Sequence, residues 1–234
     1  MFAKYGYEIH KSNGDFPYDF SDSEKQIIES VRPFTMTSRE RCLALINAVR
    51  YVVKNNIEGD VVECGVWKGG SVMAVAKTLL ELKNKDREIY LFDTFEGMPK
   101  PSEIDIQLDG NDDVMNDSPD WLKVELDNVK HNVFSTGYDK EKFHFIKGKV
   151  EDTIPLHSPK KISILRLDTD WYESTKHELI HLFPLLSVGG VLILDDYGFW
   201  NGARQAVDEY IEHNKIKILL NRIDPTGRIG IKLE

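Results

Sequence analysis

Four aspartates that follow two predicted strands could together bind a divalent cation. Asp168 and Asp170 come after one mostly apolar run, and Asp195 and Asp196 come directly after another. If the two runs are adjacent parallel strands, their carboxyl ends meet at one edge of a sheet, where ligands of such folds bind. Carboxylates held so close together raise one another's pKa. A hard cation such as Mg²⁺, which takes oxygen ligands, relieves this repulsion, so the sequence predicts a magnesium site.

The alternative is that these aspartates cap the helices that follow them, or pair with Arg166 and Arg204. Two adjacent aspartates directly after an apolar strand are hard to satisfy by capping alone. This favours the metal site over the capping interpretation.

A glycine-rich turn predicts a second site, for a nucleotide-like ligand. The turn contains Gly65, Gly69 and Gly70, follows a short strand that carries Glu63, and opens a helix. Glycines let the backbone approach a ligand, and the start of a helix offers unpaired N–H groups. The spacing is not G-x-G-x-x-G, so a ligand without a pyrophosphate is favoured. S-adenosylmethionine fits because Glu63 would lie near its positive charge; the alternative is a tight turn that binds nothing.

Asp93 ends the next predicted strand and would reach the same ligand. In nucleotide-binding folds an acid at this place accepts hydrogen bonds from the ribose hydroxyls. The alternative is that Asp93 caps the turn that follows it. Glu63 and Asp93 together support a nucleoside ligand better than either acid does alone.

The segment 177–181 matches H-E-x-x-H, the motif in which a helix presents two histidines and a glutamate to zinc. The helix that carries it is expected to cross between two parallel strands, which leaves no open face for a substrate. No later helix offers an obvious third ligand. We therefore interpret His177 and His181 as solvated helix residues rather than zinc ligands.

Short β-branched runs alternate with helical segments along the chain, as in a doubly wound α/β fold with a mostly parallel sheet. Strands are expected at 60–63, 89–93, 143–147, 162–168 and 190–195, and helices at 23–31, 71–83, 173–186 and 203–213. Two further strands, expected at 216–220 and 228–232, would form an antiparallel C-terminal hairpin and complete a seven-stranded sheet.

The chain has 234 residues, of which 41% are hydrophobic, so we expect one domain spanning residues 1–234. Residues 1–34 are expected to form a cap or an arm through which the protein could form a homo-oligomer. Residues 97–120 are rich in Pro, Asp, Asn and Ser, which predicts a lid-like insertion over the substrate.

The net charge of −9 argues against nucleic acid or an anionic membrane as a partner. No apolar run is long enough to cross a bilayer, and no export signal is evident, so we expect a cytoplasmic protein. The two cysteines, Cys42 and Cys64, are too few to suggest a disulfide framework.

With these motifs in order, the chain resembles the macrocin O-methyltransferase family over about residues 32–233. Members of this family methylate sugar hydroxyls on macrolide and aminocoumarin antibiotics. The most specific matches lie at 35–38, 63–71, 92–99, 148–153, 167–172, 194–198 and 200–208. The resemblance implies a Rossmann-like class I methyltransferase fold.

The resemblance also divides the roles of the site residues. It implies that the S-adenosylmethionine pocket is lined by Met36, Glu63, Gly65, Trp67, Ser71, Asp93, Gly97 and Asp168, with Val150 and Asp152 near the adenine. It further implies that Asp168, Asp195 and Asp196 hold Mg²⁺ and that Asp170 is the general base.

We therefore expect an enzyme that uses S-adenosylmethionine and Mg²⁺ to methylate a hydroxyl of a sugar or sugar-containing small molecule. Two alternatives stay open: a catechol-like phenol as the acceptor, and a non-catalytic protein that binds an adenosine ligand. The segment 100–120 departs from the antibiotic enzymes in composition, which leaves the identity of the acceptor open.

Overall fold

A seven-stranded sheet of order β3-β2-β1-β4-β5-β7-β6 forms the centre of the computed structural model, which describes residues 16–109 and 122–234. The strands are β1 (Asp60–Cys64), β2 (Ile89–Asp93), β3 (Phe143–Lys147), β4 (Ile162–Leu167), β5 (Leu186–Leu194), β6 (Asn221–Arg222) and β7 (Arg228–Ile231). The first five strands pair in parallel, whereas β7 runs antiparallel to both β5 and β6. The predicted doubly wound α/β fold with a C-terminal antiparallel pair is confirmed.

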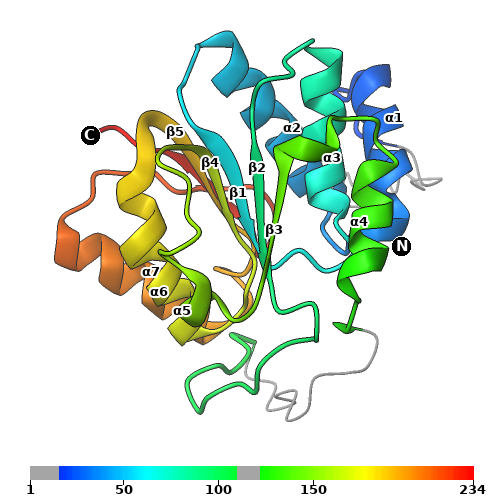
Figure 1. The fold of residues 1–234 in the computed structure, drawn as a ribbon. Helices are drawn as coiled ribbons and strands as arrows, with labels where there is room; N and C mark the ends of the chain where they lie inside the picture. Colours follow the sequence, from blue (N-terminus) through cyan, green and yellow to red (C-terminus); the bar gives the residue numbers. More distant parts are fainter. Residues whose placement is uncertain (1–15, 110–121) are drawn as a thin grey trace, which may run out of the picture.

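Helices cover both faces of the sheet (Figure 1). One face carries α1 (Asp22–Val31), α2 (Arg39–Lys54), α3 (Gly70–Glu81) and α4 (Leu126–Phe134), and the other carries α5 (Val150–Thr153), α6 (Tyr172–Leu182) and α7 (Asn201–Asn214). Short 3-10 helices lie at Arg32–Phe34, Lys140–Lys142 and Phe183–Leu185. Because side chains alternate along a strand, the adjacent residues Val61 and Val62 of β1 belong to two different apolar clusters, one for each helical layer.

The strand order reverses between β1 and β4, and this places the binding crevice. From β1 the chain proceeds outward through β2 to β3, and it then returns to β4 on the other side of β1. The register pairs Cys64 with Leu167 and Leu167 with Leu194, so β1, β4 and β5 end level with one another. Ligands of open α/β sheets bind at such a reversal, outside the carboxyl ends of the strands.

Two predicted elements at the C-terminal side are wrong. The strand expected at 216–220 is irregular, and the short strand β6 begins only at Asn221. Ile216, Ile218 and Leu220 nevertheless pack against the apolar core, so alternate burial rather than strand pairing produces the strand-like pattern.

The helix expected at 173–186 is also too long, because it ends at Leu182 and a 3-10 turn containing Pro184 follows. Consequently β5 starts at Leu186, earlier than the predicted start at 190. Its pairing with β4 shifts register before Val191, which is where the regular ladder resumes.

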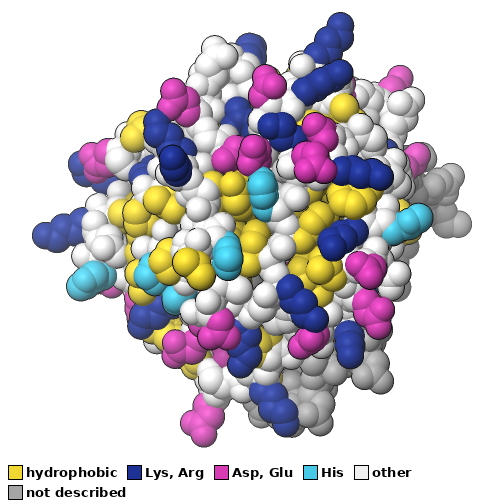
Figure 2. All heavy atoms as spheres, in the orientation of Figure 1, with side chains coloured by type: hydrophobic (Ala, Val, Ile, Leu, Met, Phe, Trp, Pro, Cys, Tyr) yellow, Lys and Arg dark blue, Asp and Glu magenta, His cyan; other side chains and the backbone are white. Residues whose placement is uncertain are grey.

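The helix α1, in the described part of the expected N-terminal cap, packs against the helices that cover the sheet. Its residues Ile27, Ile28 and Val31 belong to the same apolar cluster as residues of α2 and α3. Residues 1–15 of that cap, and residues 110–120 of the expected lid, lie outside the described residues. No helix in the described part of the chain is long and apolar enough to span a bilayer. On the face shown in Figure 2, basic and acidic side chains are interspersed.

Candidate active site

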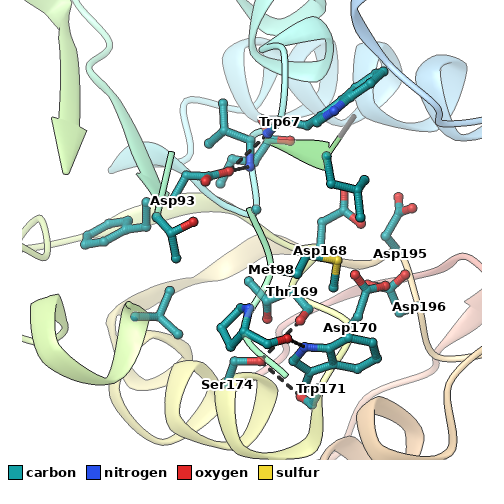
Figure 3. A pocket seen from close by; sticks show the side chains of 18 of the residues that line it. Trp67, Asp93, Met98, Asp168, Thr169, Asp170, Trp171, Ser174, Asp195 and Asp196 are labelled. Atoms are coloured by element: carbon teal, nitrogen blue, oxygen red, sulfur yellow. Dashed lines mark hydrogen bonds between the residues drawn. The ribbon is translucent and has the colours of Figure 1, made fainter. Parts of the chain in front are cut away.

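A cavity of about 690 Å³ lies at the carboxyl ends of the parallel strands. It is lined by almost all of the predicted site residues: Met36, Glu63, Gly65, Trp67, Ser71, Asp93, Gly97, Val150, Asp168, Asp170, Asp195 and Asp196. Asp152, which was expected near the adenine, is exposed and is not among the lining residues. The four aspartates from β4 and β5 gather on one side of the cavity, away from Asp93 and Trp67 (Figure 3).

The turn after β1 is pressed against the turn after β4. Gly65 has φ +82°, and a Cβ added to it would lie 1.9 Å from the carbonyl oxygen of Asp168. Any side chain at this position would therefore push the two turns apart. The backbone N–H of Asp168 donates to the carbonyl of Cys64 at 2.9 Å, which keeps the two turns in contact.

Asp93 shapes the glycine-rich turn from the neighbouring strand. Its Oδ2 accepts hydrogen bonds from the backbone N–H groups of Val66 at 2.6 Å and Trp67 at 3.0 Å. Its Oδ1 accepts one from the N–H of Phe95 at 2.7 Å. An ionised carboxylate can accept about four hydrogen bonds, so capacity for about one more bond is left. Asp93 thus organises the turn after β1, and its bond to Phe95 also caps the turn that follows Asp93, which was the alternative from the sequence.

Asp168, Asp195 and Asp196 form the group of acids best suited to a metal ion. One oxygen from each lies within 4.8 Å of the others, and in the described part of the chain this is the one such group of three ligating side chains. Asp170 stands beside them and is hydrogen-bonded to Asp196. The indole Nε1 of Trp200 donates to Oδ1 of Asp170 at 2.7 Å.

The proximity of these carboxyls changes their protonation. Burial, together with the negative charges of the neighbouring aspartates, raises the pKa of Asp196 well above its usual range. Burial and the charge of Asp168 raise the pKa of Asp170 to about 7. Burial also raises the pKa of Asp195 to about 6, although Arg166 opposes this effect. Burial and mutual repulsion therefore both disfavour the ionised forms of these carboxyls.

Arg166, next to the carboxyl end of β4, connects the two halves of the site. It is buried, and its Nη1 donates to Glu63 at 2.6 Å and to Asp168 at 2.7 Å. Its Nη2 donates to Asp195 at 2.5 Å and to the hydroxyl of Thr37 at 3.0 Å. Burial raises the pKa of Glu63 to about 8, and the Arg166 guanidinium counteracts this rise. The sequence left two alternatives for the aspartates, a cluster suited to a metal ion and ion pairs with an arginine. Both features are present in the site.

Sequence reasoning missed several residues that support the acids. Arg41 forms an ion pair with Asp195 and another with Asp224 at 2.8 Å. Trp200 packs edge-on against Trp171, with ring centroids 5.0 Å apart. Both tryptophans follow a predicted aspartate within a few residues and lie in the matched segments 167–172 and 200–208, but neither signal gave them a role.

The segment after Gly97 is anchored to this site by Asp105, which is buried. Its Oδ1 accepts the backbone N–H of Tyr172 at the start of α6 at 2.7 Å, and its Oδ2 accepts the N–H of Ser102 at 2.8 Å. Gln107 forms an isolated antiparallel bridge with Trp200. The described part of the expected lid is thus tied to the helices that carry the site.

The H-E-x-x-H segment lies on α6, and its glutamate points inward. Glu178 is buried and accepts a hydrogen bond from the hydroxyl of Thr169 at 3.0 Å. His177 hydrogen-bonds to the carbonyl of Ile154 at 3.0 Å, and its ring lies 4.4 Å from that of His181. The glutamate thus faces the turn after β4, not a ligand shared with the histidines.

Comparison with known proteins agrees with this geometry. The family described as Macrocin-O-methyltransferase (TylF) matches residues 19–229. The mycinamicin III 3''-O-methyltransferase of Micromonospora griseorubida is 32% identical over 82% of this chain and 76% of its own. The 8-demethyl-8-(2,3-dimethoxy-alpha-L-rhamnosyl)-tetracenomycin-C 4'-O-methyltransferase of Streptomyces olivaceus is 33% identical over 82% of this chain and 73% of its own. The structure of the O-methyltransferase NovP superposes with a TM-score of 0.79 at 32% identity, covering 86% of this chain and 83% of that chain.

Proposed function

Because the chain belongs to the macrocin-O-methyltransferase family and is an S-adenosylmethionine-dependent O-methyltransferase, we propose that it methylates a hydroxyl of a sugar-containing small molecule with the help of Mg²⁺. The observation that carries this proposal is the arrangement of the acids. Asp168, Asp195 and Asp196 form one group, Asp170 lies beside it, and the glycine-rich turn lines the same cavity.

The donor set suits Mg²⁺. Three carboxylate oxygens within 4.8 Å of one another offer the hard ligands that this cation prefers. Burial, and then the negative charges of Asp170, Asp168 and Asp195, raise the pKa of Asp196, so a cation placed among these carboxyls would favour their ionised form. Asp168, Asp195 and Asp196 would hold the cation, although Asp195 would share its oxygens with Arg41 and Arg166. Bound there, Mg²⁺ would supply positive charge that stabilises an ionised acceptor oxygen.

The protein's own residues would perform the remaining tasks. The turn 65–71 and Asp93 would orient S-adenosylmethionine so that its methyl group faces the acid cluster. Asp170 would take the hydroxyl proton of the acceptor. The acceptor oxygen would then form a bond to the methyl carbon while the bond from that carbon to sulfur breaks, and S-adenosylhomocysteine would leave.

A sugar is the favoured acceptor because of what the relatives methylate. The Streptomyces olivaceus relative is named for methylation of the 4' oxygen of a rhamnosyl group. In this chain the acceptor side of the cavity includes Met98 and the half-exposed Phe199, which offer apolar surface beside the acids. Such a surface can pack on the apolar face of a sugar ring.

The test is methyl transfer from isotope-labelled S-adenosylmethionine in the presence of Mg²⁺, measured by mass spectrometry. The acceptors are p-nitrophenyl α-L-rhamnoside, which offers neighbouring sugar hydroxyls, and catechol, which offers neighbouring phenolic hydroxyls. We expect a labelled methyl ether on the rhamnoside and little on catechol. A preference for catechol would assign a phenol-methylating enzyme. Tight S-adenosylmethionine binding with no transfer to any hydroxyl in a wider sugar and phenol panel would point to a binding protein.

A further inference from the structure

Glu178 is a buried acid that the proposed mechanism does not use. It lies in the middle of α6, and its side chain has no exposed surface. Burial raises its pKa well above the usual range, which disfavours the charged form of the carboxyl. The carboxyl contacts two uncharged side chains, the hydroxyl of Thr169 and the thiol of Cys64. A buried polar group costs free energy unless it is hydrogen-bonded, so these contacts account for its presence in the core.

The contact with Thr169 reaches the centre of the acid cluster. Thr169 Oγ1 donates to both carboxyl oxygens of Glu178, at 3.0 Å and 3.2 Å. Thr169 lies between Asp168, a member of the metal-compatible group, and Asp170, the proposed base. Any movement of Thr169 would therefore move both acids.

The turn that contains these acids has a costly backbone conformation. Asp170 has φ +66°, in the left-handed region that disfavours residues with a side chain. The carbonyl of Thr169 accepts hydrogen bonds from the N–H of Trp171 at 2.7 Å and from Ser174 Oγ at 3.3 Å. Glu178 holds the side chain of the same residue. Thr169 is thus fixed at both its carbonyl and its hydroxyl, which offsets the cost of the turn.

The contact with Cys64 reaches the other half of the site. Cys64 ends β1, its carbonyl accepts the N–H of Asp168 at 2.9 Å, and it directly precedes Gly65. Glu178 therefore touches the last residue before the cofactor turn and the residue between two acids of the metal turn. In the described part of the site, Glu178 is the one carboxyl that contacts both Cys64 and Thr169.

We propose that Glu178 is a positioning residue, which holds Thr169 so that Asp168 and Asp170 present their carboxyls to the cavity. This inference rests on the proposed function, because it assigns value to the position of Asp170 as the base. It also gives the H-E-x-x-H segment a role without zinc: only its glutamate is used, as a buried hydrogen-bond acceptor for Thr169.

The experiment compares variants that separate shape, hydrogen bonding and location. Glu178→Leu keeps the approximate shape and removes both hydrogen bonds, whereas Glu178→Gln keeps an uncharged acceptor. Thr169→Val removes the other partner of the same bond. His181→Gln, on the same helix and in the same motif, is the matched control. Each variant is tested for thermal stability, binding of S-adenosylhomocysteine, methyl transfer to p-nitrophenyl α-L-rhamnoside, and hydrogen exchange across residues 165–175.

We expect Glu178→Leu and Thr169→Val to lower kcat by about 10- to 100-fold, the usual effect of removing a group that orients a site ligand. KM and the Kd for S-adenosylhomocysteine should change by less than about threefold, since Glu178 does not line the cavity and the Thr169 hydroxyl is directed at Glu178. The double variant should lose little more than either single variant, because both remove one interaction. Glu178→Gln should retain most of the activity, and hydrogen exchange in 165–175 should rise only in the two disrupting variants.

Equal kcat in Glu178→Leu and the wild type would overturn the inference, as would additive losses in the double variant. Unchanged hydrogen exchange in both disrupting variants would also overturn it, and this readout needs no methyl acceptor. If the wild type failed to methylate the rhamnoside while the exchange of 165–175 rose as expected, the proposed acceptor would be wrong but the link from Glu178 to the turn would stand.

Discussion

Trp200 and Asp170 are joined by a 2.7 Å hydrogen bond from the indole Nε1 to the carboxyl Oδ1. The two residues come from the loops after β5 and β4, so the bond spans two adjacent strand ends. Trp200 is buried, and its position is fixed by edge-on packing against Trp171. The orientation of the proposed base is therefore set by a residue that has no acid–base chemistry of its own.

This bond predicts different effects for two substitutions. Asp170→Asn should lower kcat by roughly 10²- to 10⁴-fold with S-adenosylmethionine binding intact, because a general base is lost. Trp200→Phe keeps the packing but removes the donor, so we expect a smaller fall in kcat, of about 10-fold. Steady-state kinetics and calorimetry distinguish the two effects. Equal activity of Asp170→Asn and the wild type would exclude Asp170 as the base.

The acid cluster predicts a requirement for metal. EDTA should abolish methyl transfer and Mg²⁺ should restore it, because the carboxylates and water that hold a hard cation exchange readily. Asp196→Asn should weaken Mg²⁺ binding in calorimetry, and excess Mg²⁺ should recover part of the activity. Asp86→Asn, at an exposed site outside the cavity, is the control. Full activity in a preparation shown to be free of metal would rule out the cation.

The three backbone hydrogen bonds to Asp93 predict a combined loss of binding and stability. Asp93→Asn replaces one of the two accepting oxygens with an NH2 group, so the N–H groups of either Val66 and Trp67 or Phe95 lose their acceptor. We expect the free energy of unfolding to fall by about 1–3 kcal/mol and S-adenosylhomocysteine binding to weaken by about 10-fold or more. Glu58→Gln, which breaks only the exposed ion pair with Lys161, should change stability by less than about 1 kcal/mol. Urea unfolding and calorimetry provide the two readouts, and unchanged binding in Asp93→Asn would remove Asp93 from the cofactor site.

Asp105 predicts how firmly the segment after Gly97 is held. Asp105→Ala removes the acceptor for the N–H groups of Tyr172 and Ser102, so hydrogen exchange in residues 97–109 should rise. The KM for the acceptor should rise as well if this segment covers the substrate, as we propose for a lid. Glu103→Ala, an exposed neighbour, is the matched control. Faster exchange with an unchanged KM would mean that the segment is structural and does not form a lid.

Both cysteines should be unreactive in the folded protein. Cys42 and Cys64 are buried; burial raises the pKa of Cys42 to about 11 and that of Cys64 well above its usual range. Because the thiolate is the reactive form, a chromogenic disulfide reagent at pH 8 should label neither thiol until guanidinium unfolds the chain. Rapid labelling of either thiol in the native protein would show that its surroundings open more readily than the packing indicates.

The sequence was sufficient to predict the sheet and the acids at its edge. Strand ends at Glu63, Asp93 and Asp168 are recognisable because an apolar run stops at a polar residue, and a parallel sheet brings such ends to one edge. Pairing of Arg166 with the aspartates was one alternative from the sequence, but its contact with Glu63 could not be predicted, because that contact depends on the alignment of β1 beside β4. The irregular run 216–220 was misread because packing on one face gives the same alternation as a strand.

The placement of Glu178 shows a different kind of limit. Its motif matches a zinc-binding pattern that the sequence already argued against, but the sequence did not show that Glu178 hydrogen-bonds to Thr169 while His177 hydrogen-bonds to the carbonyl of Ile154. Helix rotation depends on which face is buried, and the short apolar pattern of α6 does not define that face on its own. Likewise, three backbone N–H groups engage Asp93 only because the turn after β1 folds over it.

The arrangement of β1 between β2 and β4 has a consequence for biosynthesis. Glu63 and Arg166, which pair across β1 and β4, are 103 positions apart in the chain. At a translation rate of about 5–20 residues per second, β1 waits on the order of 5 to 20 s for this neighbour to leave the ribosome. During that interval the edge of β1 that will receive β4 is unpaired, and apolar side chains such as Val62 lack their cover. A nascent chain stalled before β4 should therefore neither retain S-adenosylmethionine nor resist aggregation. The incomplete sheet of β1, β2 and β3 would at this stage expose a surface to which a chaperone could bind.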